Sequence, residues 1–183
     1  MTSSASCASC EPGWACPSPG MYQMTTRCAA GHYCPANTID ATTSSCPAGT
    51  YSDARNLTHI SGCLDCPESK ACAAASTSST WSDCAPGFYC PKGTEMSTQN
   101  ACPAGTYSNR TNLGSDAECT TCPRGYFCQG GKTTPDGNCA AGYYCPLESA
   151  SSTEEACPAG TYSNAIDNYL KAQCIDCPPG SYC

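Results

Sequence analysis

The residues with the greatest capacity for chemistry are the cysteines, 21 of them in a chain of 183 residues. Thiols can form disulfides, hold zinc in tetrahedral sites or act as redox pairs, and C-x-x-C spacing is typical of the last two uses. The chain contains four C-x-x-C pairs, whose first members are Cys7, Cys63, Cys119 and Cys174. The wider spacing of the cysteines decides which chemistry is favoured.

Zinc binding and thiol redox chemistry both fit this wider pattern poorly. The chain has two histidines, His32 and His59, and neither recurs in the other repeats described below. A zinc site gives no reason for the regular x5 and x11 spacings between the other cysteines, and a thioredoxin-type pair needs a βαβ context that the sequence does not predict. We therefore interpret the cysteines as disulfides, which persist in an oxidising extracellular compartment.

No other arrangement of residues points to catalysis or to a cofactor. The sequence has no G-x-S-x-G element, no phosphate-binding loop and no Ser-His-Asp set that we can place, and Glu154-Glu155 is interpreted as a solvated loop pair. The net charge is −7 with 8 Lys and Arg, which excludes a surface that neutralises nucleic acid. No apolar run is long enough to span a membrane. We predict a protein that is not an enzyme and that holds no metal and no cofactor.

Two asparagines carry the N-glycosylation signal, Asn56 in Asn56-Leu-Thr58 and Asn109 in Asn109-Arg-Thr111. This signal is used in exposed loops of secreted proteins. Both asparagines fall in the long loop of every third unit of the repeat, and we interpret them as the same repeat position. We predict covalent glycans on both; the third copy, Asn164-Ala-Ile166, lacks the signal.

The cysteines recur in the pattern C-x2-C-x5-C-x11-C-x5-C-x11-C-x16, with steps of 56, 56 and 55 residues between C-x-x-C pairs. The only length change is one missing residue between Cys128 and Cys139. We predict an N-terminal flank (1–6), three cysteine-rich repeats (7–62, 63–118 and 119–173) and the start of a fourth (174–183). Because each repeat of such an array contacts only its neighbours, the array is predicted to be an elongated rod.

A shorter unit recurs within each repeat, with the sequence C-[PA]-x-G-x-[YF]-[CS]. Proline presets φ and glycine has no Cβ penalty, so we expect a tight turn flanked by short β-hairpins. Every third unit ends in Ser (Ser52, Ser108 and Ser163), and a cysteine reappears later in a longer loop. The unit from Cys66 to Cys72 has no glycine and is predicted to be the most irregular. One helical turn is predicted within residues 164–172.

The composition provides little material for an apolar core, with no valine, five leucines and four isoleucines. Such a chain buries too little apolar surface to offset the entropy of folding unless it is cross-linked. The predicted fold class is therefore small and disulfide-rich, with tandem repeats, short β-hairpins and little regular secondary structure.

Segments such as Cys102-Pro-Ala-Gly-Thr-Tyr-Ser-Asn and Cys119-Thr-Thr-Cys122-Pro-Arg-Gly-Tyr-Phe resemble ephrin-receptor-like cysteine-rich repeats. These repeats are similar to the cysteine-rich modules of tumour-necrosis-factor receptors. The resemblance extends from Cys7 to Cys183 and is specific for the type of module, not for its function. Long arrays of such modules occur in surface proteins of flagellated and ciliated protists, including the subunits of mastigonemes.

The resemblance implies that the first cysteine pairs with the second, the third with the fifth and the fourth with the sixth, one of 15 connectivities open to six cysteines. The implied disulfides are Cys10–Cys28, Cys16–Cys34, Cys46–Cys63, Cys66–Cys84, Cys72–Cys90, Cys102–Cys119, Cys122–Cys139, Cys128–Cys145 and Cys157–Cys174. Cys7, Cys177 and Cys183 are left without partners in the array. This remainder, and a first segment without the apolar stretch of a signal peptide, predict a piece of a longer array.

The regularity of the repeats predicts a structural role, as a segment of an extracellular filament or cell-surface coat such as a mastigoneme-like fibre. Its partners would be copies of itself or other filament subunits at the cell or flagellar surface. The alternative is a receptor-like or adhesive ectodomain that binds a ligand. Local departures from the pattern, at Trp14, Met21-Tyr22, Trp81 and the Cys66 unit, are where such a site is expected, although we interpret both tryptophans as loop packing.

Overall fold

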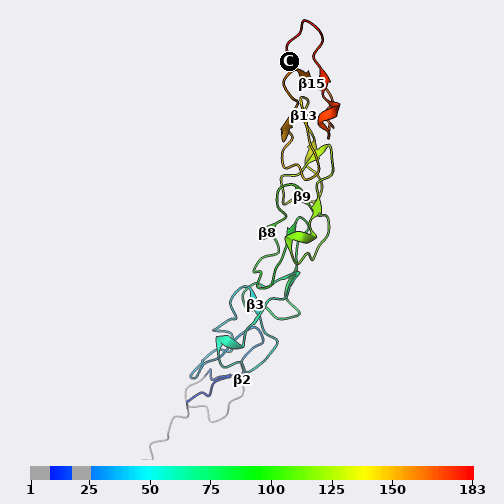
Figure 1. The fold of residues 1–183 in the computed structure, drawn as a ribbon. Coiled ribbons are helices and arrows are strands. Elements are labelled where there is room, and N and C mark those ends of the chain that lie inside the picture. The colour runs from blue at the N-terminus through cyan, green and yellow to red at the C-terminus, as the bar shows by residue number, and fades with distance from the viewer. Residues whose placement is uncertain (1–8, 18–25) are drawn as a thin grey trace, which may run out of the picture. The chain divides into compact units, whose positions relative to one another are not determined.

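The structure is a computed structural model that describes residues 9–17 and 26–183 (Figure 1). The predicted flank 1–6, Cys7 and Met21-Tyr22 lie outside the described residues. The chain divides into two compact units, one formed by residues 1–82 and 91–96 and the other by residues 83–90 and 97–183. Within each unit the hairpins follow one another in the order of the sequence.

Every strand in the described residues is two residues long, and consecutive strands pair two by two, from β1 with β2 to β15 with β16. The strands are β1 (Trp14–Ala15), β2 (Thr26–Arg27), β3 (Thr50–Tyr51), β4 (Leu64–Asp65), β5 (Lys70–Ala71), β6 (Ser82–Asp83), β7 (Phe88–Tyr89), β8 (Asn100–Ala101), β9 (Thr106–Tyr107), β10 (Thr120–Thr121), β11 (Tyr126–Phe127), β12 (Gly137–Asn138), β13 (Tyr143–Tyr144), β14 (Glu155–Ala156), β15 (Thr161–Tyr162) and β16 (Ile175–Asp176). In the same part of the chain there are three 3₁₀ helices, η1 (Ile60–Gly62), η2 (Asp116–Glu118) and η3 (Lys171–Gln173), and each precedes a cysteine. The predicted fold class, a disulfide-rich chain of tandem hairpins, is confirmed.

Each hairpin begins at a tight turn of seven residues, which we name by its opening cysteine. In the Cys46 turn, the Thr50 N–H donates to the Pro47 carbonyl at 3.1 Å and the Thr50 hydroxyl donates to the same oxygen at 2.7 Å. Gly49 between them has φ +79°, the left-handed conformation that this turn requires. The same turn, closed by hydrogen bonding to the proline carbonyl, recurs at Thr106 and Thr161.

The Cys66 turn is regular, so the prediction that it would be the most irregular unit is wrong. Ser69 takes the place of the glycine and adopts the same left-handed conformation, with φ +69°. The Lys70 N–H still donates to the Pro67 carbonyl at 3.3 Å. The predicted helical turn within 164–172 is replaced by η3, which shares only Lys171 and Ala172 with that range.

Among the described cysteines, seven disulfides close single turns and three close a longer loop. Six residues separate the partners in Cys10–Cys16, Cys28–Cys34, Cys66–Cys72, Cys84–Cys90, Cys122–Cys128, Cys139–Cys145 and Cys177–Cys183. Seventeen residues separate the partners in Cys46–Cys63, Cys102–Cys119 and Cys157–Cys174. The three longer disulfides are those that the resemblance implied.

The other six implied disulfides are wrong: Cys10–Cys28, Cys16–Cys34, Cys66–Cys84, Cys72–Cys90, Cys122–Cys139 and Cys128–Cys145. The reason is local, because each turn reverses the chain and brings its first and last residues to Cα separations of 5.6 to 6.1 Å, within disulfide reach. Cys177 and Cys183, expected to lack partners within the array, pair with each other in the same way. Only turns that end in Ser send their opening cysteine to a partner further along the chain.

Sulfur forms most of the apolar core. Among the described residues, the buried apolar side chains are those of cysteines together with Ala15, Ala71 and Leu113. The aromatic residue at the sixth position of the turn is only half-buried, at Tyr33, Tyr51, Tyr89, Tyr107, Phe127, Tyr144 and Tyr162, whereas Tyr182 is exposed. Ala15 and Ala71 occupy this aromatic position in the two turns that lack the ring, and both are buried.

Within each compact unit, backbone hydrogen bonds attach a turn to the one that follows it. The Gly31 N–H donates to the Ser52 carbonyl at 2.7 Å, and the Gly31 carbonyl accepts from Cys46 at 2.8 Å. The N–H of the turn glycine is therefore bonded to the last residue of the following turn, and its carbonyl is bonded to the first residue of that turn. The same pair of bonds is formed by Gly13, Gly49, Gly105, Gly125 and Gly142.

Within each compact unit, the segment after a turn lies against the two preceding turns. After the Cys139 turn, the Glu148 N–H donates to the Cys122 carbonyl at 3.1 Å, and the Ser149 carbonyl accepts from Cys128 at 2.9 Å. The Glu148 carbonyl lies against Gly105, two turns back, where an added Cβ would be 2.4 Å from it. Equivalent approaches occur at Gly13, Gly31, Gly49, Gly87 and Gly125. Glycine is thus required at these turns for close approach as well as for its conformation.

We predict that Gly105→Ala and Gly142→Ala differ in their effects on stability. Both glycines have φ +83° and form the same two hydrogen bonds, so both variants incur the left-handed penalty of about 1–2 kcal/mol. Only Gly105→Ala also drives a Cβ into a backbone carbonyl, because among the described residues of this 183-residue chain an added Cβ at Gly142 meets nothing within 4 Å. We expect Gly105→Ala to lose about 1–3 kcal/mol more, measured by guanidinium unfolding with the disulfides intact. Equal losses would contradict the close packing of alternate turns.

Candidate functional sites

The cysteines and histidines have structural roles in the part of the chain that the structure describes. Twenty cysteines there form ten disulfides, and no group of three or more His, Cys, Asp or Glu side chains within residues 9–17 and 26–183 could hold a metal ion. His59 accepts the Ser61 N–H at 3.2 Å and so caps η1. His32 Nδ1 lies 3.0 Å from the Ala30 carbonyl. Neither histidine is placed with another to form a ligand set.

Both tryptophans contact residues of the same chain. The Arg27 guanidinium lies over the Trp14 ring, 5.5 Å from its centroid, across the β1–β2 hairpin. Trp81 packs edge to face on Tyr51, with 5.0 Å between the ring centroids. These contacts agree with our interpretation of the tryptophans as loop packing.

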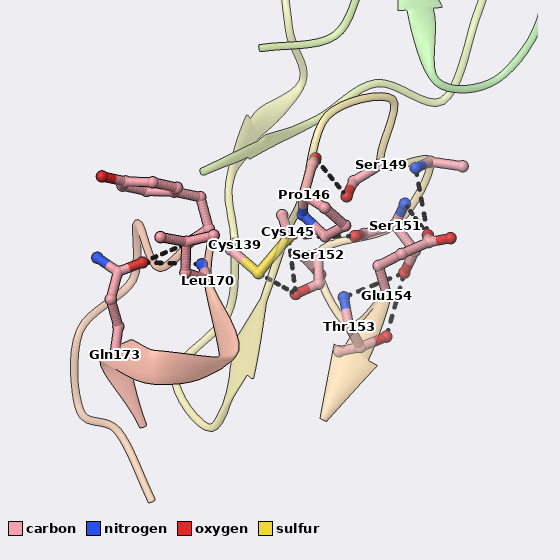
Figure 2. The surroundings of a disulfide bond; sticks show 12 residues. Cys139, Cys145, Pro146, Ser149, Ser151, Ser152, Thr153, Glu154, Leu170 and Gln173 are labelled. Carbon is pink, nitrogen blue, oxygen red and sulfur yellow. Dashed lines mark hydrogen bonds between the residues drawn. A yellow bond between two sulfur atoms is a disulfide. The ribbon is translucent and has the colours of Figure 1, made fainter. Parts of the chain in front are cut away.

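A carbonyl oxygen covers the disulfide in the second turn of each repeat. Figure 2 shows the Ser152 carbonyl beside the Cys139–Cys145 disulfide, 3.4 Å from one sulfur and 3.9 Å from the other. An oxidised sulfur has no proton to donate, so this is a close contact and not a hydrogen bond. The carbonyls of Ala41 and Ser97 lie in the same way against the equivalent disulfides.

Acidic and amide side chains hold these loops in shape. The Glu154 carboxylate accepts the N–H groups of Ala150 and Ser151 at 3.2 and 3.1 Å (Figure 2). Glu154 was interpreted from the sequence as a solvated loop residue, so this role was missed. Gln173 accepts the N–H groups of Tyr169 and Leu170 in a similar way. The sequence signal for this role is a Glu or Gln that lies three to four residues after the residues whose N–H groups it accepts.

Charged groups elsewhere form local contacts. The N–H and hydroxyl of Thr42 both donate to the Asp40 carboxylate, at 2.9 and 2.8 Å, and hold the pKa of Asp40 below its usual value. Lys92 forms an exposed ion pair with Asp65 at 3.0 Å. Such exposed pairs contribute little to stability.

The two glycosylation signals occupy different positions of the repeat, so our interpretation of them as equivalent is wrong. Asn109 follows the buried Ser108 directly, whereas Asn56 lies four residues after the equivalent Ser52. Asn56 corresponds to Asn112, and both have left-handed backbones, with φ +73° and +62°. Counting from the buried serine, and not from the length of the loop, would have shown this from the sequence.

Surroundings also separate the two signals. Asn109, Arg110 and Thr111 are all exposed. Asn56 is half-buried, and its Oδ1 is enclosed without a hydrogen-bond partner. A Cβ added to Gly13 would lie 2.8 Å from the carbonyl oxygen of Asn56. Only Asn109 therefore lies on an open loop.

Asn168 is a buried polar residue at a position that the earlier repeats fill with leucine. It lies five residues after Ser163, as Leu57 and Leu113 lie five residues after Ser52 and Ser108. Its side chain is 3% exposed, and Nδ2 has no hydrogen-bond partner. Its carbonyl still accepts the Cys145 N–H at 2.8 Å, as the Leu113 carbonyl accepts that of Cys90. The backbone role is retained while the side chain is mismatched.

The chain matches none of the protein-family models and none of the curated proteins with which it was compared. Among the residues that the structure describes, no helix is both long enough and apolar enough to cross a membrane. The arrangement of the described residues is that of a disulfide-rich tandem hairpin repeat, a fold typical of non-catalytic extracellular modules.

We predict that Asn168→Leu stabilises the second compact unit. A buried amide nitrogen without a partner costs about 1–3 kcal/mol, and leucine removes that cost while keeping the backbone hydrogen bond. The midpoint of guanidinium unfolding should rise accordingly. The reverse exchange, Leu113→Asn, serves as the matched control and should lower the midpoint. An unchanged or lower midpoint for Asn168→Leu would show that the amide is satisfied in solution.

Proposed function

We propose that the chain is a structural repeat segment of an extracellular filament or cell-surface coat, of the mastigoneme-like kind, and not an enzyme. The observation that supports this most strongly is the repetition of one bonding scheme. In each compact unit the turn glycines are bound by the next turn, and the following segments lie on the two turns before them. No described turn adopts a different backbone conformation.

This scheme suits a load-bearing element. A turn that is bonded to the next turn and packed against the segment beyond it resists bending more than a chain of independently linked modules. The disulfides add covalent closure that persists in an oxidising medium. We infer an elongated array whose partners are copies of itself or other filament subunits, and a module type of the ephrin-receptor-like kind.

A receptor-like or adhesive role would require a surface that departs from the repeat. The departures that the structure describes are engaged internally, since Trp14 is covered by Arg27 and Trp81 packs on Tyr51. The Cys66 turn has the same conformation as the others. These contacts favour the structural role over the ligand-binding role.

Electron microscopy of native material, with an antibody against this chain, tests the proposal. We expect antibody label at regular intervals along a filament or coat, because the repeats are nearly equal in length. The same sample treated with a reductant should lose the label pattern, since the fold depends on the disulfides. Isolated monomers that carry label and bind a soluble ligand would contradict the proposal.

A further inference from the structure

We propose that N-linked glycosylation distinguishes the two signals, so that Asn109 carries a glycan in the folded protein and Asn56 does not. The inference rests on the proposed extracellular function, because the modification requires passage through the secretory pathway. It goes beyond the signals themselves, which are equally complete: Asn-Leu-Thr at Asn56 and Asn-Arg-Thr at Asn109. The difference lies in the backbone around them.

Asn109 lies on an exposed turn that is fixed by its neighbour. The buried Ser108 hydroxyl accepts the Arg110 N–H at 3.1 Å, which holds the backbone on both sides of Asn109. The asparagine, Arg110 and Thr111 all face solvent. A branched sugar on Asn109 therefore displaces no packed group.

Asn56 lies in the segment that packs against earlier turns. Its carbonyl and Cβ both approach Gly13, and a Cβ added there would lie 2.8 and 3.3 Å from them. The next residue, Leu57, accepts the Cys34 N–H at 2.8 Å. Because Oδ1 is enclosed and the Leu57 carbonyl is bonded to Cys34, a sugar on Nδ2 would crowd the segment that packs against Gly13.

The chemistry is the same at any acceptor asparagine. The side-chain nitrogen attacks C1 of an oligosaccharide that is linked to a polyprenyl diphosphate. The N–C1 bond forms as the C1–O bond breaks, the polyprenyl diphosphate leaves with the electron pair, and Nδ2 loses one proton to a base. The N–C1 bond is stable once formed, so selection between the two signals acts at folding: a chain modified at Asn56 could not complete the packing around Gly13 and would not be secreted as oxidised protein.

The third repeat provides a matched position for testing this explanation. Asn164 follows the buried Ser163 just as Asn109 follows Ser108, and the Ser163 hydroxyl accepts the Ala165 N–H at 3.1 Å. Residues 164–166 are all exposed. The position lacks only the hydroxyl residue of the signal, because Ile166 stands where Thr111 stands in the second repeat. Ile166→Thr should therefore create a third signal that behaves like that of Asn109.

The experiment compares four versions of the 183-residue chain secreted by a eukaryotic cell behind a cleavable leader: the native chain, Thr58→Ala, Thr111→Ala and Ile166→Thr. Thr58 and Thr111 are both exposed, so their exchange removes one signal each without touching the asparagines. Glycans on the secreted, fully oxidised protein are counted by intact mass and located by peptide mass spectrometry after enzymatic deglycosylation.

We expect one glycan on the native chain, at Asn109. Thr111→Ala should lose it, Thr58→Ala should keep it, and Ile166→Thr should gain a second glycan at Asn164. A glycan on Asn56 of the oxidised native chain would overturn the inference, and so would an unmodified Asn109 or Asn164 in these proteins. The glycosylated sites are measured on the secreted recombinant chain, whereas the filament proposal is tested on native material. A failure of the filament proposal can therefore be told apart from a failure of the glycosylation proposal.

Discussion

Covalent closure of a seven-residue turn is the constraint on which the rest of this structure depends. With no valine and with Leu113 as the one large aliphatic residue of the described core, the chain cannot fold by apolar burial alone. In the chain-entropy model, each short loop stabilises by about 2 kcal/mol and each longer loop by about 3 kcal/mol. Ten such closures replace the burial that an ordinary domain of this length would obtain.

The turns then become the building blocks of a tertiary structure made largely of backbone contacts. Gly105 is bound on both sides by the Cys122 turn, and the Glu148 carbonyl lies directly against it. Close approach of backbones needs small residues at fixed intervals, which explains why the repeat conserves its spacing around the glycine. Side chains such as Glu154 and Gln173 accept hydrogen bonds from the loop N–H groups that have no backbone acceptor.

Much of this architecture could be predicted from the sequence, because it depends on the spacing of the cysteines. The short hairpins, the scarcity of helix and the three disulfides across the longer loops were all predicted and are confirmed. The short disulfides were missed because a family pairing was preferred to the geometry of the turn. The useful signal was Ser52, Ser108 and Ser163: where the turn lacks its second cysteine, one reappears later in the chain.

The candidate sites were harder to predict, because exposure depends on contacts between distant segments. Asn56 and Asn109 carry equally complete signals, and only the approach of Asn56 to Gly13 separates them. Likewise, nothing local in the sequence shows that Asn168 replaces a buried leucine; that follows from counting residues after Ser163 and comparing the repeats. The fold boundaries predicted at 7–62, 63–118 and 119–173 stay predictions.

Peptide mapping of the unreduced protein tests the central claim, that disulfides close single turns, most directly. Trp81 lies between the Cys66 turn and the Cys84 turn, so chymotryptic cleavage after it cuts the chain between them. With Cys66–Cys72 and Cys84–Cys90 formed, the two turns separate into different fragments before any reduction. Fragments that stay joined until a reductant is added, by Cys66–Cys84 and Cys72–Cys90, would contradict the account.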